Sequence, residues 1–318
     1  MIILRADSAN ELYSAACRAV LDHGRRSLPR GMGTVEVLGA HLCLAQPRRR
    51  YIDVPPARII NPAFAVAEAL WILSGSDDPW IFRYNQSLAR YADDGRLQGA
   101  YGPRIRRWRD KVDQLDHVRT LLGRDPDSRQ GVVQIYDAER DTLGHRDVPC
   151  TLSYRFFLRE ERLHMHTTMR SQDLWLGFPY DIFTTTLIQE LMAGWLGASV
   201  GEYHHHVDSL HLYDKNVTGA GEVAAASVIS APMPKLAVPW DSLPSMLAGV
   251  IAGDPPASVG PEWVSFTTIL ASYRAWQDGD RDGARRAIAC PTDDLGRALA
   301  RWYEHLTRRR KARLGHES

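Results

Sequence analysis

A single cysteine, Cys150, stands behind a proline in the stretch "DVPCTLSYRF", at the predicted start of a β-strand. A lone cysteine is most often a small buried hydrophobic residue. The neighbours of Cys150 favour another interpretation. Pro149 fixes the backbone before the thiol, and arginines on the following strand could lower the pKa of that thiol. The pattern therefore indicates a thiolate that could act as a covalent nucleophile.

A second group of reactive side chains lies in "RSQDLWLGFPYDIF", which places Arg170, Ser171 and Asp173 close together. The planar guanidinium fork of an arginine next to a hydroxyl donor suits the recognition of a phosphomonoester. A solvated salt bridge at the end of a hairpin would have the same composition. Both interpretations stay open from these residues alone.

Glu68 is the one charged residue within "FAVAEALWIL", so it faces apolar neighbours on almost any helical projection. An unpaired buried carboxylate is costly. Such a residue is therefore paired in an ion pair, held neutral, or catalytic with a raised pKa. A catalytic role and a structural ion pair are therefore the two alternatives for Glu68.

The run His204, His205 and His206 resembles a metal-binding tract, but consecutive strand residues point to opposite faces of a sheet. The three imidazoles therefore cannot converge on one ion, and we predict no metal site. The basic run "TRRRKAR" near the end of the chain is typical of a solvated helix end, and nucleic-acid binding through it would be unspecific.

The composition sets the class of protein that could carry these residues. The 318 residues are 44% hydrophobic and carry a formal charge of +1, which implies no general attraction to nucleic acid or membranes. The four cysteines show no CxxC spacing, so neither a zinc site nor a disulfide framework is expected. No apolar run is long enough for a signal peptide or a membrane helix. These features predict a cytoplasmic protein.

The elements that must position the reactive residues follow from hydrophobic periodicity. The sequence predicts an α/β body over 1–240 and a mainly helical extension over 241–318, with Pro-rich connectors after about residue 230. In the body, a hairpin follows Cys150, with its polar tip at Arg159–Arg162. The predicted helices cover 10–24, 61–75, 79–92, a segment ending at Gly123, 184–197 and most of 263–313. The other predicted strands cover 131–137, 201–213 and 33–45, which is either a strand pair or one strand bulged around Gly39.

Seven patches occur in the order seen in thymidylate synthases and their relatives, the pyrimidine-nucleotide hydroxymethylases. They are "RGMGT", "AEALWILSG", "YGPRIRRW", "DPDSR", "VPC", "RSQDLWLGFPYDI" and "HLY". The resemblance covers about residues 30 to 240, and "RSQDLWLGFPYDI" is its most specific part. It implies an α/β (α+β) fold with a large bent mixed β-sheet, a homodimer, a pyrimidine nucleoside monophosphate as substrate, and 5,10-methylenetetrahydrofolate as co-substrate.

The resemblance also implies roles for individual residues. Cys150 matches the nucleophile that attacks C6 of the pyrimidine, and Glu68 matches a glutamate that organises water and proton transfer. The matched phosphate-binding residues are Arg30, Arg170 and Ser171, joined by Arg129 of the partner subunit. His211 and Tyr213 match a pair that binds the sugar 3′-hydroxyl, Tyr101 lines the cavity, and the folate side is assigned to Leu88, Asp173, Gly177 and Tyr180.

Asp181 departs from the thymidylate synthase pattern, which has asparagine at this place. An amide satisfies the N3–H donor and O4 acceptor of uracil. A carboxyl group can instead accept from the N4 amino group of cytosine and, when it or N3 carries a proton, complete a second bond. An unpaired buried polar group costs about 1–3 kcal/mol, and such a site can reject the wrong analogue by roughly 10⁴-fold. The carboxylate therefore predicts a cytosine nucleotide, as in the CMP and dCMP hydroxymethylase branch.

A further departure concerns the reaction outcome. Leu88 and Asp147 stand where thymidylate synthases have a tryptophan and a leucine that shield the reacting methylene from water. The stretch "WYEHLTRRRKARLGHES" also lacks a counterpart of the family's closing tail. Both differences favour hydroxymethylation over methylation. The alternatives that remain are a dUMP methylase, which would form dihydrofolate, and a non-catalytic relative that binds nucleotide or RNA through its basic C-terminal helices.

Overall fold

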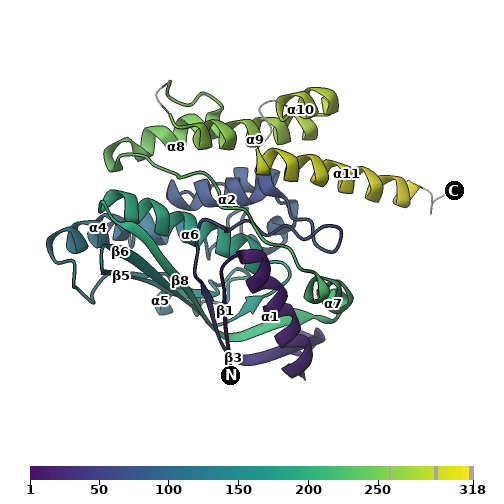
Figure 1. Ribbon diagram of the computed structural model, residues 1–318, viewed down its shortest axis with the longest axis horizontal. Coiled ribbons are helices and arrows are strands. Elements are labelled where there is room, and N and C mark those ends of the chain that lie inside the picture. The colour runs from purple at the N-terminus through teal and green to yellow at the C-terminus, as the bar shows by residue number, and fades with distance from the viewer. Residues whose placement is uncertain (258, 290–292, 315–318) are drawn as a thin grey trace.

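The computed structural model (Figure 1) describes residues 1–257, 259–289 and 293–314, and side chains only up to Arg308 within the last helix. Cys290 and the final residues 315–318 lie outside the described part, as do the side chains of most of the basic run near the C-terminus. Within the described residues, no helix is long and apolar enough to cross a membrane.

A mixed β-sheet of eight strands, counted over the described residues, forms the base of the molecule (Figure 1). Its main order is β1-β3-β8-β6-β5-β4, with β2 paired to β3 and β7 paired to β8. β3 and β8, β5 and β6, and β4 and β5 are antiparallel, whereas β6 and β8 are parallel. The strand bounds are β1 Ile2–Ala6, β2 Arg25–Ser27, β3 Thr34–Leu44, β4 Val132–Gln134, β5 Thr151–Arg159, β6 Arg162–Met169, β7 Gln172–Asp173 and β8 Ser199–Tyr213.

The long strands β3 and β8 change their buried face near the middle. In β8 the buried residues are Tyr203, His205 and Val207 on one side of Asp208, but the next buried residue is Leu210. Gly39 lies opposite Asp208 in β3 and takes a φ of 76°, a left-handed conformation that glycine adopts at little cost. The pairing register of β3 and β8 is the same on both sides of Gly39, so neither strand has an extra residue there and the structure does not show the predicted bulge. β3 runs through Gly39 as one strand, and the buried face changes in both strands at this point.

Helices cover the sheet in layers. α1 (Ala9–His23) contacts β1, β3 and α7 (Val217–Ala225), and α6 (Phe178–Trp195) contacts β6 and β8. α2 (Pro62–Leu73) packs on α6 on the side away from the sheet (Figure 1). The shorter helices of the body are α3 Tyr101–Arg106, α4 Gln114–Arg124 and α5 Ala138–Asp141, with 3₁₀ turns η1 Pro29–Gly31 and η4 Asp214–Asn216.

The C-terminal region is helical, as predicted, and it lies over α2. Its elements are η5 Trp240–Ser242, α8 Leu243–Ala252, α9 Pro261–Gln277, α10 Arg281–Ala287 and α11 Asp294–Leu314. α8, α9 and α11 all contact α2 (Figure 1). Ion pairs join Arg83 to Asp278 and Arg301 to Asp53. With α6 on one side and these helices on the other, α2 is a buried helix, which explains why its sequence is apolar nearly all round.

Two predicted helices differ from the structure. The segment 79–92 is not one helix but two 3₁₀ turns, η2 Pro79–Arg83 and η3 Gln86–Tyr91, because the Asn85 side chain accepts a hydrogen bond from the Ser87 amide and starts a new turn. α6 begins at Phe178 and not at residue 184. Pro179 falls in its first turn, where proline needs no hydrogen-bond donor, so "GFPYD" is a helix start and not a separate turn.

Candidate active site

Cys150 and Arg170 meet where the hairpin β5–β6 opens. Cys150 directly precedes β5 and Arg170 directly follows β6, and the Arg170 amide donates to the Cys150 carbonyl at 2.9 Å. The Arg170 guanidinium folds back on the same loop, where Nε donates to the Pro149 carbonyl at 3.0 Å and Nη2 to the Val148 carbonyl at 3.0 Å. Arg170 is therefore fixed beside the thiol, with Nη1 unbonded among the described residues.

The thiol of Cys150 is partly exposed, unlike the buried thiols of Cys17 and Cys43. Burial raises the pKa of Cys150, while the charge of Arg170 acts in the opposite direction and is outweighed. The prediction that neighbouring arginines act to lower this pKa is confirmed for Arg170 and Arg30, but burial is the larger effect and the net shift is upward. The reason is the low-dielectric surroundings of the sulfur, which also include the carboxyl groups of Asp181 and Asp147.

Tyr101 lies at the same loop from the first turn of α3. Its hydroxyl accepts a hydrogen bond at 3.3 Å from the amide of Thr151, the residue that follows Cys150 in the chain. Burial raises the pKa of Tyr101 well above its ordinary value, with further contributions from Asp181 and Cys150. Tyr101 therefore enters the site as a neutral phenol.

Glu68 and Asp181 form a pair of carboxyl groups from α2 and α6. Glu68 is the most exposed residue of α2, whose other residues are buried. Burial, and then the charge of Asp181, raise the pKa of Glu68 well above its ordinary value. No basic side chain of the described chain lies within ion-pair distance of Glu68, which argues against the structural ion pair.

Asp181 occupies the first turn of α6. Burial raises the pKa of Asp181 from 3.8 to about 6, and a hydrogen bond from Gln172 opposes this shift. That bond joins Gln172 Nε2 to Asp181 Oδ2 at 2.8 Å. Near neutral pH, this carboxyl group therefore exchanges a proton readily, which is the property that a two-bond contact with cytosine requires.

Gln172 and His205 are site residues that the sequence reasoning missed. Gln172 is buried, and its Oε1 lies 3.0 Å from His205 Nε2; His205 Nδ1 in turn lies 2.8 Å from the Tyr203 hydroxyl. Gln172 stands between two predicted site residues in "RSQD", and its neutral amide gave no signal of its own. His205 lies in the run of three histidines, whose composition suggests a metal tract and so conceals a role in a hydrogen-bond chain.

The turn between β7 and α6 is held by Asp173. Its Oδ1 accepts from the amides of Trp175 at 2.8 Å and Leu176 at 2.9 Å, and Oδ2 has no bond within the described structure. A Cβ at Gly177 would lie 2.7 Å from Gln172 Nε2, so the backbone can pass close to the Gln172 amide only at a glycine. The free carboxylate oxygen suits an N–H donor of a second, heterocyclic ligand.

The remaining predicted residues lie at varying distance from this centre. His211 and Tyr213 end β8, with ring centroids 5.4 Å apart, and the His211 carbonyl accepts from the Leu174 amide.

The Tyr180 hydroxyl accepts from the Asn61 amide at 3.1 Å, and Leu88 is partly buried in η3. Arg30 is exposed at a φ of 52°, and its charge acts to lower the pKa of Cys150. Ser171 is half-buried next to Arg170 in the chain.

Arg129 is the predicted site residue that the described chain does not bring to this centre. It lies exposed in the connection between α4 and β4, away from the hairpin opening. Its position does not conflict with a role in the site of a second subunit, which was the prediction.

Comparison with known proteins places the chain in a family. The family model described as thymidylate synthase matches residues 11–246. The chain belongs to the thymidylate synthase family. The resemblance and the mixed sheet flanked by helices that it implied are thereby confirmed.

Two curated relatives are both named deoxyuridylate hydroxymethyltransferase. The protein of Bacillus phage SP01 is 35% identical over 227 residues, which are 67% of this chain and 59% of that protein. The protein of Pseudomonas phage M6 is 29% identical over 242 residues, which are 74% of this chain and 66% of that protein. The chain thus spans less than two thirds of the length of either relative.

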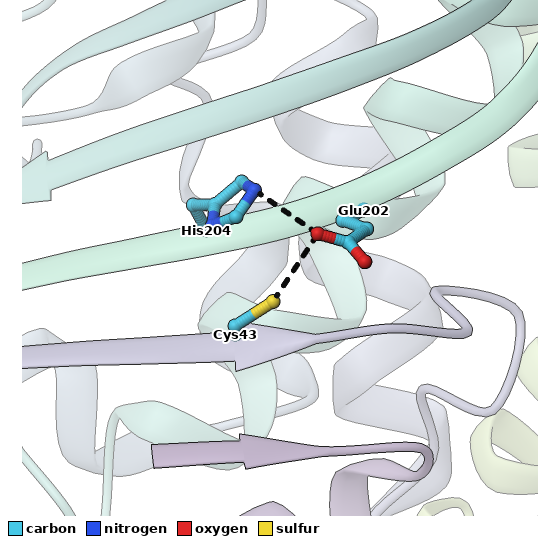
Figure 2. Close-up of side chains that lie close together, drawn as sticks. All are labelled: Cys43, Glu202 and His204. Atoms are coloured by element: carbon cyan, nitrogen blue, oxygen red, sulfur yellow. Dashed lines mark hydrogen bonds and ion pairs between the residues drawn. The ribbon is translucent and has the colours of Figure 1, made fainter. Parts of the chain in front are cut away.

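A separate cluster in this member of the thymidylate synthase family could hold a metal ion. Cys43, Glu202 and His204 each offer one ligand atom, and these atoms lie within 4.8 Å of one another on β3 and β8 (Figure 2). The Arg5 guanidinium already contacts both Cys43 Sγ and Glu202. The cation of Arg5 accounts for the grouping of these side chains.

His204 and His205 point to opposite faces of β8, as predicted, because one is partly exposed and the other buried.

Proposed function

We propose that this protein is a folate-dependent pyrimidine-nucleotide C5 hydroxymethylase whose substrate is CMP or dCMP and whose product is the 5-hydroxymethyl nucleotide. The observation that carries the proposal is the meeting of a thiol, Cys150, with two carboxyl groups of raised pKa, Glu68 and Asp181. A nucleophile for C6 and a proton-exchanging group for water addition are the two functions that such a reaction needs.

Asp181 is the reason to name cytosine. Both named relatives carry deoxyuridylate in their names, so a uracil nucleotide is the second candidate. A carboxyl group with a pKa of about 6 can hold a proton for cytosine N3 while its other oxygen accepts from the N4 amino group. Uracil would place its O4 acceptor against a carboxylate oxygen. The mismatch disfavours uracil when Asp181 is ionised, because two acceptors then face each other.

The chain's own residues then act in sequence. Arg170, Ser171 and Arg30 bind the 5′-phosphate, and the Cys150 thiolate adds to C6, which makes C5 nucleophilic. 5,10-Methylenetetrahydrofolate supplies the one-carbon unit to C5. Loss of the C5 proton, together with cleavage of the bond between the one-carbon unit and the folate nitrogen, releases tetrahydrofolate unoxidised and leaves a methylene on the ring. Water positioned by Glu68 then adds to that methylene, and Cys150 leaves as C6 regains its double bond.

Two observations support water over hydride as the final reactant. Asp147 lies beside Cys150, and its carboxyl Oδ2 accepts from the Gly99 amide at 3.0 Å. Leu88 is only partly buried in a 3₁₀ turn. A polar group and a modest aliphatic one would admit water to the methylene, where a large aromatic shield would exclude it.

The experiment that tests the base is a competition between nucleotides. Wild-type protein and Asp181→Asn are given equimolar cytosine and uracil nucleotides with the folate, and C5 proton release is followed. We expect the wild type to favour cytosine and Asp181→Asn to shift toward uracil by about tenfold or more. A wild type that consumes dUMP alone would overturn the cytosine assignment and leave the deoxyuridylate alternative.

We also propose that two copies associate, with Arg129 of the partner subunit joining the phosphate site. The support is the exposed position of Arg129 and the partly exposed face of β8 that carries Glu202, His204 and His206. A row of such polar, half-buried side chains on a long central strand is typical of a sheet face that meets another surface.

A further inference from the structure

A buried chain of hydrogen bonds runs from the core of the sheet to Asp181. Its links are Thr167 to the Tyr203 hydroxyl at 3.0 Å, Tyr203 to His205 Nδ1 at 2.8 Å, His205 Nε2 to Gln172 Oε1 at 3.0 Å, and Gln172 Nε2 to Asp181 Oδ2 at 2.8 Å. Thr167, Gln172, Tyr203 and His205 are each at most 2% exposed.

Two acceptors beside the Gln172 amide nitrogen set the direction of donation, because Nε2 lies 2.8 Å from Asp181 Oδ2 and 3.4 Å from the Asp173 carbonyl oxygen. The amide of Gln172 must point its N–H to the carboxylate, so its oxygen accepts from His205 Nε2–H. A neutral imidazole protonated on Nε2 has a bare Nδ1, which lies 2.8 Å from the Tyr203 hydroxyl. That hydroxyl donates to Thr167 Oγ1 at 3.0 Å, so its proton lies between Thr167 and His205 Nδ1. Burial keeps His205 neutral, since it lowers the pKa of this imidazole to about 3.

The direction of the chain has a consequence for Asp181. Oδ2 accepts from the Gln172 donor and keeps a second lone pair, while Oδ1 has no hydrogen bond among the described residues, so both oxygens can still meet a base. A reversed Gln172 amide would set its oxygen against the ionised carboxylate and the Asp173 carbonyl, which costs more than a lost bond. These two acceptors therefore fix the orientation of Gln172, His205 supports it from the other end of the amide, and Gln172 fixes the rotation of the Asp181 carboxyl group.

We propose that Gln172, supported by His205, is a positioning residue for base recognition, because its amide fixes the rotation of the Asp181 carboxyl group and so the direction in which both carboxyl oxygens meet the pyrimidine. The inference rests on the proposed function in that Asp181 contacts the base. It goes further by assigning base selectivity to a residue that need not touch the substrate, and by making the imidazole at position 205 part of the same device.

The test compares Gln172→Leu with a matched buried glutamine, Gln189→Leu. Gln189 is also fully buried and donates to the strand carbonyls of Leu163 and Gly201, but it is outside the chain to Asp181. Nucleotide binding without folate is measured by calorimetry, and base preference by competition. We expect Gln172→Leu to lower the cytosine-over-uracil preference at least about tenfold, mainly through KM, and Gln189→Leu to leave the preference unchanged.

A second measurement follows the titration of the Asp181 carboxyl group with pH, and it includes the variant His205→Gln. Removing the donor to Oδ2 should raise the pKa of Asp181 above about 6, which isotope-edited infrared spectroscopy of the aspartate carboxyl stretch detects in the ligand-free protein. We expect this rise in Gln172→Leu, a smaller one in His205→Gln, and none in Gln189→Leu.

The two proposals fail in different ways. A folded Gln172→Leu that keeps both the wild-type base preference and the wild-type Asp181 titration overturns the positioning role, while the enzyme assignment stands. A wild type that binds neither cytosine nor uracil nucleotide overturns the proposed function. In that case the infrared titration still decides whether Gln172 controls the carboxyl group.

Discussion

Cys150 sits in surroundings that favour the thiol over the thiolate in the ligand-free protein, because burial outweighs the charge of Arg170. A nucleophile of this kind becomes reactive only when the site changes around it, for instance when a bound nucleotide reorganises the guanidinium groups. The sequence revealed the residue through its Pro149 neighbour and the family motif. It could not reveal the balance between burial and charge, which depends on the packing of several elements.

Replacing Cys150 by alanine tests its covalent role. Cys150→Ala should reduce turnover to background while nucleotide binding changes by less than about tenfold, because the phosphate and base contacts remain. Tritium release from C5-labelled nucleotide measures turnover, and calorimetry measures binding. Cys17→Ala is the control, since that thiol is buried in α1. Appreciable tritium release from Cys150→Ala would contradict covalent catalysis.

Because the pKa of Asp181 is raised in the folded protein, we expect the free energy of unfolding to fall as the pH rises. The carboxyl group binds a proton more tightly when folded, at about 6, than when unfolded, at 3.8. Between these values the folded state holds more protons, so the free energy of unfolding falls as pH rises, by about 3 kcal/mol once pH exceeds the folded pKa. Asp181→Asn should therefore be more stable than the wild type at pH 8, with the difference vanishing near pH 4. Denaturant unfolding at both pH values checks this; an equal difference at both would contradict it.

At the scale of elements, hydrophobic alternation was enough to predict the hairpin β5–β6, the strand β3 and the strand β8. The period of a strand is fixed by the backbone, so its pattern survives in the sequence. The start of α6 was missed because a proline and a glycine near a helix start look like a turn. The relay from His205 through Gln172 to Asp181 was missed because it joins β8, β7 and α6, and no local pattern encodes such a meeting.

The packing of α3 against the end of α2 sets the position of Tyr101. A Cβ at Gly102 would lie 2.6 Å from the Ser76 carbonyl oxygen and 2.8 Å from the Ser76 amide nitrogen, both of which are backbone atoms. Gly102→Ala should therefore push α3 away, destabilise the protein by about 1–3 kcal/mol, and lower kcat by moving Tyr101.

Gly123→Ala is the matched control for that change. In α4, a Cβ at Gly123 would meet only Leu196 Cδ2, at 4.0 Å, so alanine should be neutral or stabilising by up to about 1 kcal/mol. Thermal unfolding and steady-state kinetics of both variants measure the effect. Equal stability and activity of the two variants would show that the close approach at Gly102 does not set the position of Tyr101.

At the scale of the whole molecule, the C-terminal helices and α6 enclose α2 and its single carboxylate, Glu68. The sequence predicted these helices, and the unbroken apolar character of α2 implied that something covers both sides. What covers it could not be predicted, because contacts such as that between α9 and α2 join residues some two hundred positions apart along the chain. The boundary near residue 240 stays a prediction.

A shared active site predicts complementation between two inactive variants. Cys150→Ala and Arg129→Ala should each be poorly active alone, but a mixed dimer has one site with both Cys150 and the partner's intact arginine. Unfolding and refolding an equimolar mixture should restore up to about a quarter of wild-type activity, since half of the dimers are mixed and each has one complete site. Sedimentation establishes the dimer. No gain over the separate variants would contradict a contribution of Arg129 across subunits.

The central claim is tested most directly by weighing the product. The protein is incubated with 5,10-methylenetetrahydrofolate and, separately, CMP, dCMP, UMP and dUMP, and each nucleotide is analysed by mass spectrometry. We predict a gain of one CH₂O unit on a cytosine nucleotide, without formation of dihydrofolate. A gain of CH₂ on dUMP accompanied by dihydrofolate, or no change in any of the four nucleotides, would contradict the account.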